Sequence, residues 1–276
     1  MALISSYLVS VRDMISRKRA DERFYNPNDI MTILEIGLTG IPYLKFGSLI
    51  SEGGIATGTG IDRSARGFGD VNYLKVGNIG EYFIKYDEVE TVSEDVVEKY
   101  NMTLLEPNDL LMSRVGTVGN VCIFRREDPK SAFSDNVIKI RLLNSPQINP
   151  MYVCTLLSSE YCRAQIRRYA KQSLQEVINH TSIRNLIVPL PDINTQNQIA
   201  AQVMSGFEKI KEHEQAIARR REEIASVVKS KLFLDIEGIA NVEHSQLLAM
   251  LDELDKNARK TSAAFSKQKA LEDFEA

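Results

Sequence analysis

The chain has 276 residues, a formal net charge of −3 and 43% hydrophobic residues. That length fits one large domain or a medium-sized domain with an appendage, and the hydrophobic fraction is sufficient for a sizeable core. No stretch approaches the roughly 18 uninterrupted apolar residues of a membrane-spanning helix, so neither secretion nor membrane insertion is indicated and a cytoplasmic location is expected. The three cysteines, Cys122, Cys154 and Cys162, share no disulfide or metal-ligand spacing, which favours buried thiols in a reducing compartment.

The first 40 residues predict two helices separated by a break. An amphipathic opening is followed by the basic run Arg17-Lys18-Arg19 and then by Phe24-Tyr25-Asn26-Pro27. Pro27 disfavours helical geometry at Asn26, so we expect one helix before this point and one after it.

Residues 41–141 predict a small sheet. Short β-branched and aromatic runs alternate there with Gly, Asn and Asp, and thirteen of the fifteen glycines lie before position 120. The predicted elements are strands at residues 73–76, 110–113 and 120–124, a long flexible loop at 53–69, and a short helix at 94–100 capped by Ser93.

The remainder of the chain predicts mainly helices. One helix is expected over residues 150–171, followed by a strand at 186–188 that runs into Pro189-Leu190-Pro191. Residues 194–233 contain no proline and predict a single helix of about 60 Å. After a break at 235–243, a second amphipathic helix is expected at 245–260, and a polar tail at 261–276.

The long helix carries an apolar stripe typical of a coiled coil. Every seventh position is apolar, with two further apolar residues at the complementary seam positions, and together these are Val203, Phe207, Ile210, Ile217, Ile224 and Val228. Glu214 and Arg221 interrupt the second seam, which suits an antiparallel pairing of two arms. The alternative is an amphipathic helix packed against its own domain.

These elements predict an α+β fold. A small mixed α/β domain occupies residues 1–193, a coiled-coil-like helical arm follows at 194–260, and a polar tail ends the chain at 261–276.

The sequence lacks the patterns of a catalytic site. His180, His213 and His244 have no metal-ligand spacing, Asn26-Pro27-Asn28 lacks the second proline and the aromatic residue of a methyltransferase motif, and Gly116-Thr117-Val118-Gly119 is too short for a dinucleotide or phosphate loop. Binding is therefore favoured over catalysis, and we expect no catalytic residue, metal or cofactor in this chain.

The distribution of charge allows a positive face despite the acidic total. Residues 81–109 carry nine acidic side chains against Lys85 and Lys99, whereas the rest of positions 1–193 has 20 basic against 14 acidic residues. Reading of DNA bases requires long donors and amides, with Lys or Arg at the phosphates. The candidates, all in or beside predicted loops and strand ends, are Arg63, Arg66, Lys75, Asn78, Arg114, Asn120, Arg125 and Arg126.

Three segments resemble the specificity subunits of type I restriction-modification systems and the related recognition domains fused to type IIG enzymes. Residues 70–79 are similar to the family's strand that enters the early recognition region after a glycine-rich loop. Residues 107–119, Pro-Asn-Asp-Leu-Leu-Met-Ser-Arg-Val-Gly-Thr-Val-Gly, resemble its proline, aspartate, leucine-serine-arginine and twin-glycine pattern. Residues 187–191, with Gln196 and Ile199, are similar to the segment that leads into its long helix.

The resemblance implies a non-catalytic domain that grips double-stranded DNA and a helix that pairs with an equivalent helix. It implies methyltransferase subunits as partners, which supply S-adenosylmethionine, and a restriction subunit as a further candidate partner. The chain departs from the full subunit in having one recognition domain and one arm instead of two of each. Either two copies form a homodimer that reads a symmetric, bipartite site, or a second half-subunit completes the protein.

Two other interpretations stay open. Residues 19–27 also resemble the start of recognition domains in fused enzymes, which would make the chain a detached type IIG domain. A coiled-coil scaffold whose α/β domain binds protein is favoured by the acidic composition, and an enzyme with an unrecognised site is the weakest alternative. Salt dependence separates DNA binding from scaffolding, because only phosphate contacts produce an affinity that falls steeply with salt.

Overall fold

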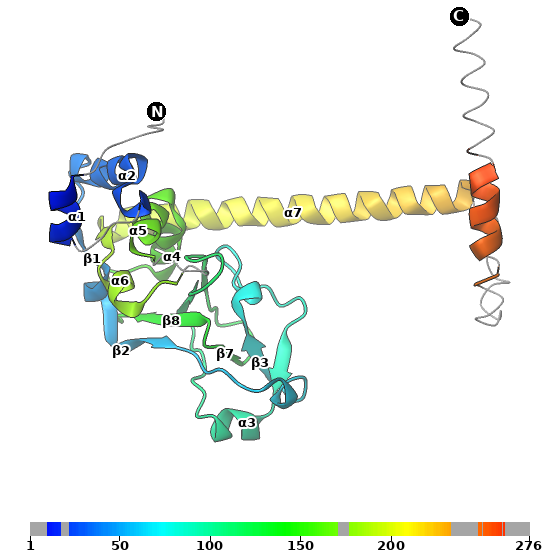
Figure 1. The fold of residues 1–276 in the computed structure, drawn as a ribbon, viewed down its shortest axis with the longest axis horizontal. Helices are drawn as coiled ribbons and strands as arrows, with labels where there is room; N and C mark the ends of the chain where they lie inside the picture. Colours follow the sequence, from blue (N-terminus) through cyan, green and yellow to red (C-terminus); the bar gives the residue numbers. More distant parts are fainter. Residues whose placement is uncertain are drawn as a thin grey trace, which may run out of the picture. The chain divides into compact units, whose positions relative to one another are not determined.

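The computed structural model describes residues 10–17, 22–170, 177–232, 248–249, 251–260 and 262, and Figure 1 shows their fold. The chain divides into two compact units, residues 1–207 and 208–276. The first unit contains helices and short strands, and the helix α7 (Ile193–Leu232) follows the last strand. The prediction of a mixed helix-and-sheet domain followed by a long helix is therefore confirmed.

The N-terminal region forms the two helices that the sequence predicts. These are α1 (Val11–Arg17) and α2 (Pro27–Leu38), with a short 3-10 helix, η1 (Glu22–Tyr25), between them. Asn26 is the N-cap of α2, since its side-chain oxygen accepts hydrogen bonds from the backbone N–H of Asn28 at 2.9 Å and of Asp29 at 3.4 Å. Pro27 has no backbone N–H and therefore suits the first helical position, where an N–H would lack an acceptor within the helix. The Asn26-Pro27 pair thus explains both the break after η1 and the start of α2.

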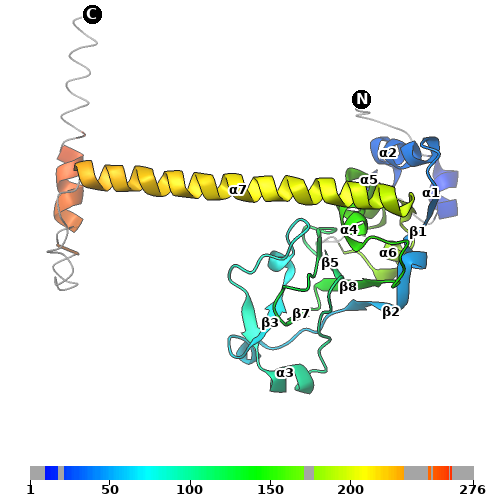
Figure 2. The same cartoon turned by 180° about the vertical axis from the view of Figure 1, so that it is seen from behind.

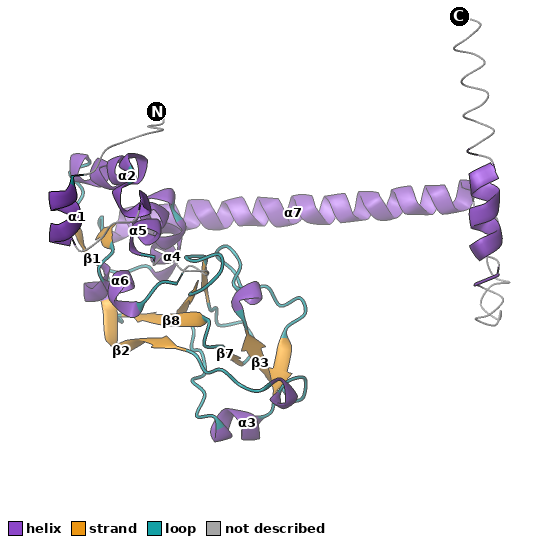
Figure 3. Cartoon of the chain, viewed as in Figure 1, coloured by secondary structure: helices purple, strands orange, loops and turns teal. Residues whose placement is uncertain are grey.

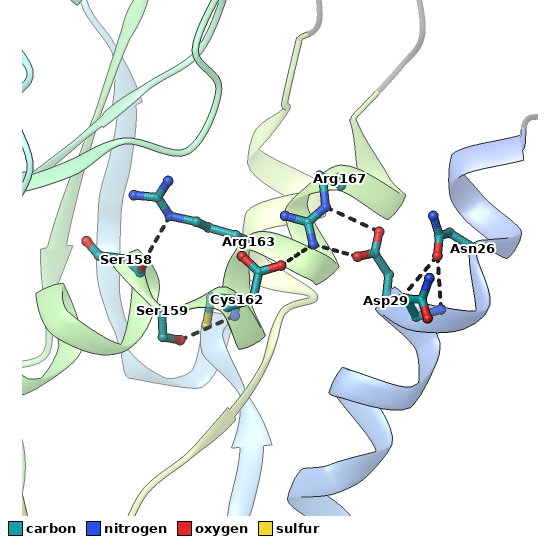
Figure 4. Close-up of polar contacts among 9 residues, drawn as sticks. Asn26, Asp29, Ser158, Ser159, Cys162, Arg163 and Arg167 are labelled. Carbon is teal, nitrogen blue, oxygen red and sulfur yellow. Dashed lines mark hydrogen bonds and ion pairs between the residues drawn. The ribbon is translucent and has the colours of Figure 1, made fainter. Parts of the chain in front are cut away.

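Arginines of α5 (Glu160–Tyr169) hold this N-terminal segment in place (Figure 4). Arg167 forms an ion pair with the buried Asp29 of α2 at 2.5 Å, and Arg168 donates from Nε to the Phe24 carbonyl oxygen at 2.8 Å. Arg163 donates instead to the Ser158 carbonyl oxygen at 2.9 Å. The arginines of this helix thus form hydrogen bonds and ion pairs mainly with other parts of the same chain.

The centre of the first unit is a four-stranded antiparallel sheet with the order β2-β8-β5-β6. Its strands are β2 (Ile50–Thr57), β8 (Val137–Leu142), β5 (Leu110–Ser113) and β6 (Val121–Ile123). Alternate side chains enter different hydrophobic clusters, because successive residues of a strand point to opposite faces. Leu110 and Met112 join the cluster that includes the helices, while Leu111 joins a second cluster on the other face.

Two smaller sheets complete the unit. The strand β3 (Val71–Leu74) pairs antiparallel with β4 (Glu90–Val92) and parallel with β7 (Ser131–Phe133). Helix α3 (Glu94–Lys99) follows β4, and Ser93 caps it as predicted, accepting from the Val96 N–H at 3.4 Å. The strands β1 (Tyr43–Lys45) and β9 (Ile187–Pro189) form an antiparallel pair, which joins segments far apart in sequence.

The single helix predicted over residues 150–171 is wrong, because the chain forms two helices there. These are α4 (Pro150–Ser158) and α5, and Figure 3 shows them grouped with α6 (His180–Arg184) beside the sheet. Ser159 has an extended ψ of 155°, and its hydroxyl oxygen accepts from the Cys162 N–H at 3.4 Å. Ser159 therefore ends one helix and caps the next, as serine often does.

The long loop predicted at residues 53–69 is also wrong in its first part. Ile50–Thr57 is strand β2, whose register against β8 shifts between Ile50 and Ile55. Gly53 at φ +64° supplies the conformation that such an irregularity requires. Gly54 leaves space for the Arg141 carbonyl oxygen, which would lie 2.6 Å from an added Cβ. Two glycines here therefore mark an irregular strand.

The first turns of α7 are part of the first unit (Figure 2). Gln196 is fully buried, accepts from the Asn149 N–H at 3.0 Å, and donates to the carbonyl oxygens of Gln147 and Pro191. Phe207 contacts the rings of Tyr82 and Phe83 with centroids 4.8 and 5.0 Å away. The predicted domain boundary at residues 193 and 194 coincides with the start of α7, whereas the division between the units follows Phe207.

The C-terminal part of the chain is described in pieces. Residues 248–249 and 251–260 are helical, in agreement with the helix predicted at 245–260. The predicted tail at 261–276 lies outside the described residues except for position 262, and so does the side chain of Val228. Among the described helices, none has both the length and the apolar character needed to cross a membrane.

The three cysteines are buried and free, as expected from their spacing. Burial raises the pKa of the Cys154 and Cys162 thiols to about 12, so both remain protonated at neutral pH. Within the part of the chain that the structure describes, no group of three His, Cys, Asp or Glu side chains could hold a metal ion.

Candidate nucleic-acid interface

The segment Pro107–Gly119 begins with a turn that ties β5 to β8. Asn108 adopts a φ of +73°, and Asp109 directly after it is only 1% exposed. The Asp109 carboxylate accepts from Arg141 Nε at 2.7 Å and Nη2 at 2.9 Å, and also from the Glu106 N–H at 2.9 Å. This aspartate is therefore a structural residue that fixes the start of the strand.

The other end of the same segment is a closed loop. The Ser113 hydroxyl donates to the Thr117 carbonyl oxygen and accepts from the Asn120 N–H at 2.9 Å. Gly116 and Gly119 have φ values of +74° and +87°, which favour glycine. An added Cβ at Gly119 would lie 3.0 Å from Cδ1 of Ile166 in α5. Ser113 thus closes the loop by hydrogen bonds within it, and Ile166 of α5 packs closely against Gly119. Arg114 lies at the start of this loop.

Arg114 is half-buried and anchored by main-chain contacts. Its backbone N–H donates to the Asn136 carbonyl oxygen at 3.0 Å, and its guanidinium donates to the Asp135 carbonyl oxygen at 3.1 Å. Within the described residues it has no carboxylate partner. Its charge is therefore not neutralised locally, which suits an anionic ligand.

A second basic side chain and a histidine lie near this loop. His180 begins α6, and its Nε2 lies 2.9 Å from Thr57 Oγ1. The pKa of His180 is lowered, first by burial and then by the positive charges of Arg114 and Arg184. Burial is the larger cause, and the two guanidinium groups add to it because their positive charges disfavour the protonated imidazole.

A cavity of about 350 Å³ opens beside the loop, and we call it the Arg66 pocket. It is lined by Arg66, Tyr73, Lys75, Val76, Gly77, Val115, Gly116, Ser134, Asp135 and Asn136. Two residues predicted to contact DNA, Arg66 and Lys75, thus line the same pocket as Val115, which directly follows a third, Arg114. The pocket combines the region around β3 with the loop after β5 and the turn between β7 and β8.

Both basic residues in the pocket already have a carboxylate partner. Glu90 pairs with Lys75 Nζ at 2.6 Å and with Arg66 Nη1 at 3.5 Å. The hydrogen bond from Lys75 is the main cause of the lowered pKa of Glu90. Arg66 also donates to the Ile61 carbonyl oxygen at 2.6 Å and lies over the Tyr73 ring at 5.2 Å. The Arg66 guanidinium is therefore engaged in contacts within the chain, whereas the Lys75 side chain remains 39% exposed.

The other predicted DNA contacts are scattered. Asn78 is buried, accepts from the Lys75 N–H and donates to the Lys85 carbonyl oxygen. Asn120 precedes β6, whereas Arg125 and Arg126 follow it, so this strand separates them. Arg63 lies exposed in the 3-10 helix Arg63–Ala65. Contact with DNA stays a prediction for each of these residues.

Arg125 and Arg126 differ in the number of contacts that their guanidinium groups make within the chain. Arg125 pairs with Asp128 at 3.2 Å and Glu127 at 3.1 Å and lies over the Phe83 ring at 5.0 Å. Arg126 is exposed and, among the described residues, forms no ion pair. Of the two, Arg126 is the freer to meet a ligand.

The predicted dimerisation stripe falls into two parts. Val203 and Phe207 are partly buried in the first unit. Ile210, Ile217 and Ile224 are 51%, 52% and 63% exposed. Such exposed isoleucines at seven-residue spacing favour pairing with another helix.

Sequence patterns did not identify the remaining members of the site. Arg184, Asp135 and Asn136 lie on segments that are distant from Arg114 in sequence, and no spacing connects them. His180 has no metal-ligand spacing, and nothing in the sequence connects it with Arg114. Only the fold brings these side chains together, through the Val115–Val177 bridge and the β5–β8 pairing.

Comparison with known proteins identifies related chains. The model of the family described as the type I restriction modification DNA specificity domain matches residues 61–219, more than half of the chain. The EcoBI specificity subunit of Escherichia coli is 24% identical over 140 residues, which cover 50% of this chain and 28% of that protein. The MjaVIII specificity subunit of Methanocaldococcus jannaschii is 24% identical over 165 residues, covering 58% and 37%. The chain spans about a third of the length of these curated relatives.

Two restriction proteins are among the solved structures that match part of the chain. The S subunit of a type I restriction-modification system from M. genitalium has a TM-score of 0.48 and 17% identity, covering 71% of this chain and 46% of that chain. The type IIG restriction endonuclease BpuSI has a TM-score of 0.48 and 13% identity, covering 70% and 30%.

Proposed function

We propose that this chain, which belongs to the family of type I restriction modification DNA specificity domains, reads a short sequence of double-stranded DNA for a partner methyltransferase and has no catalytic role of its own. The observation that carries the proposal is the Arg114 loop. It lies within the matched residues, and its guanidinium has only a carbonyl partner among the described residues. DNA phosphates and guanine edges are natural partners of such a group.

The proposed DNA-binding face consists of Arg114, Arg184 and His180, together with Lys75 of the Arg66 pocket. Lys75 is offset by Glu90, whereas the positive charges of Arg114 and Arg184 both reach His180. Phosphate contacts from these groups would fix the position of the domain, and base contacts from the surrounding loops would give specificity. Chemistry on the base, with S-adenosylmethionine as methyl donor, would belong to the partner, which is expected to extrude the target base.

We further propose that two copies associate through α7. The exposed stripe of Ile210, Ile217 and Ile224 supports an arm that is incomplete alone. Two identical domains held at a fixed distance would read a symmetric, bipartite site, as two-fold dimers do. Each copy would also dock one methyltransferase subunit, with a restriction subunit as a further partner.

DNA binding is tested by titrating the full chain with a duplex selected from a randomised pool at several salt concentrations. The affinity is expected to fall with a slope of about −0.9 per neutralised phosphate. Arg114→Ala should weaken binding by about 1–3 kcal/mol, while Arg12→Ala, an exposed arginine of α1, serves as the matched control. Unchanged affinity of a folded Arg114→Ala variant would reject the assignment of Arg114. A chain that binds no DNA at all would support the scaffold interpretation instead.

The partnership is tested by sedimentation of the chain alone and mixed with a methyltransferase subunit from the same organism. A dimer that takes up two methyltransferase subunits is expected. The chain alone, incubated with DNA and S-adenosylmethionine, should transfer no methyl group. Sustained transfer without the partner, or a monomer that ignores the methyltransferase, would contradict the proposal.

A further inference from the structure

Phe68 is an aromatic side chain that the fold leaves in solvent. It lies in the loop between the 3-10 helix Arg63–Ala65 and strand β3, and it is 77% exposed. Nearby aromatic and apolar residues of the same region, such as Tyr73 and Val71, are buried. A large apolar side chain gains free energy by leaving water, so a ligand that covered Phe68 would be favoured by burial of its ring.

The backbone on both sides of Phe68 is fixed. The Gly67 N–H donates to the Thr91 carbonyl oxygen at 2.8 Å. Gly67 and Gly69 have φ values of +93° and +113°, and an added Cβ at Gly69 would collide with the Val92 carbonyl oxygen and with Ser93. Only glycine fits this close approach to β4 without strain. The contacts of Gly67 and Gly69 therefore hold the loop against β4, with the Phe68 side chain in solvent.

Arg66 anchors the same loop to the pocket. Its guanidinium is held by the Ile61 carbonyl oxygen, by Glu90 and by the Tyr73 ring. An aromatic ring on such an anchored loop has few torsions to restrict on binding, so little of its contact energy is lost to ordering. Rigid aromatic anchors of this kind are used for tight and geometrically specific contacts.

We propose that Phe68 is an apolar wedge that packs against a DNA base step and so helps to determine specificity. The inference rests on the proposed DNA-reading function. Phe68 is two residues from Arg66, which lines the Arg66 pocket, so the Cα atoms of the two residues lie within about 7 Å of each other. DNA-binding proteins commonly insert Phe between base steps, at the cost of partial unstacking.

Local charge favours a base contact over a phosphate contact for this loop. Glu90 and Glu94 are paired with Lys75 and Lys130, at 2.6 and 2.5 Å. Asp62 accepts from the Tyr100 hydroxyl at 3.1 Å, and Asp70 remains exposed beside the loop. Asp62 and Asp70, which have no cationic partner among the described residues, disfavour phosphate at the loop itself, whereas stacking on a base requires no positive charge.

A wedge also predicts which base steps are preferred. Pyrimidine–purine steps such as TA and CA unstack most easily, so the energy of deformation is lowest there. Selection from a randomised duplex pool by the wild-type chain should therefore enrich such a step at one fixed position of the site. Selection by a Phe68→Ala variant should lose the preference at that position and keep it elsewhere.

The decisive experiment measures affinity and its salt dependence for the full chain and the selected duplex. Phe68→Ala should lower affinity about 5- to 100-fold at every salt concentration, with an unchanged salt slope, because it removes no phosphate contact. Arg114→Ala should instead reduce the magnitude of the slope by about 0.9. Phe68→Trp, which retains a flat ring, should restore most of the affinity. Leu38→Ala removes another exposed apolar side chain, 86% exposed on α2, and is the control.

Failure of the wedge is distinguishable from failure of the proposed function. If the wild-type chain binds and Arg114→Ala weakens it while Phe68→Ala does not, only the wedge is rejected. If Phe68→Ala keeps its affinity for DNA but loses the methyltransferase in sedimentation, the ring is a protein-docking residue and the inference is overturned. If no selected duplex binds the wild-type chain, both proposals fall. Fluorescence of 2-aminopurine placed at the enriched step should rise on binding, and only with a ring at position 68.

Discussion

Replacement of Asp109 by asparagine should destabilise the first unit strongly. The carboxylate is 1% exposed and accepts three hydrogen bonds, two of them from Arg141. Removal of one partner of a fully buried ion pair costs about 3–5 kcal/mol, because the other charge is left uncompensated. The Arg141 side chain is 33% exposed and keeps Glu106 at 2.8 Å, so solvent and the second carboxylate reduce the cost. We therefore expect a loss of about 2–3 kcal/mol.

Urea unfolding at pH 7 measures this loss. Asp109→Asn should shift the midpoint to lower urea with an unchanged slope of the transition. Glu106→Gln is the matched control, because that carboxylate is 65% exposed and its pair with Arg141 should contribute less than about 1 kcal/mol. A free energy of unfolding for Asp109→Asn within about 0.5 kcal/mol of the wild type would refute the structural role assigned to Asp109.

Three further predictions concern the loop, the histidine and the arm. Gly119→Ala places a Cβ 3.0 Å from Ile166 at a φ of +87° and should cost about 1–2 kcal/mol in thermal unfolding, whereas Gly77→Ala, which meets nothing within 4 Å, should cost clearly less. Because the folded-state pKa of His180 is lowered, the unfolded chain binds more protons between that pKa and about 6.5, so stability should fall as pH decreases through this window. Urea midpoints at pH 7.5 and 5.5 check this, and a decrease as large in His180→Gln as in the wild type would reject it. Ile210→Asp combined with Ile217→Asp should give a monomer by light scattering, and an unchanged mass would reject pairing of the arms.

Local signals in the sequence predicted the elements whose cause is local. Asn26 before Pro27 and Ser93 before Glu94 begin helices because their side chains satisfy free N–H groups, and these contacts lie within three residues. The strand at Leu110–Ser113 agrees with its prediction, since its four apolar or small residues are flanked by turn residues. In these segments the nearest neighbours decide the conformation, so no knowledge of the fold was needed.

Elements stabilised by distant partners were missed. Strand β2 contains Gly53 and Gly54, and only the pairing with β8 makes an irregular strand of a segment that otherwise predicts a loop. Ser159 breaks a helical pattern because its hydroxyl caps α5, a choice that hydrophobic periodicity does not reveal. The candidate site depends on such pairings as well, because Arg114 and Arg184 both act on His180 only through contacts that the fold creates.

The segment with the most specific family resemblance serves mainly to hold the fold. Asp109 forms an ion pair with Arg141, and the Ser113 hydroxyl forms the hydrogen bonds that close the loop. Gly119 allows a close approach to Ile166. Of this segment, Arg114 is the side chain left with an uncompensated charge. Resemblance through such residues identifies a scaffold and a common way of presenting one arginine, but it carries no information about the bases that are read. Under the proposed function that information lies in side chains that the fold does not use, and Phe68, which is 77% exposed, is the one proposed here.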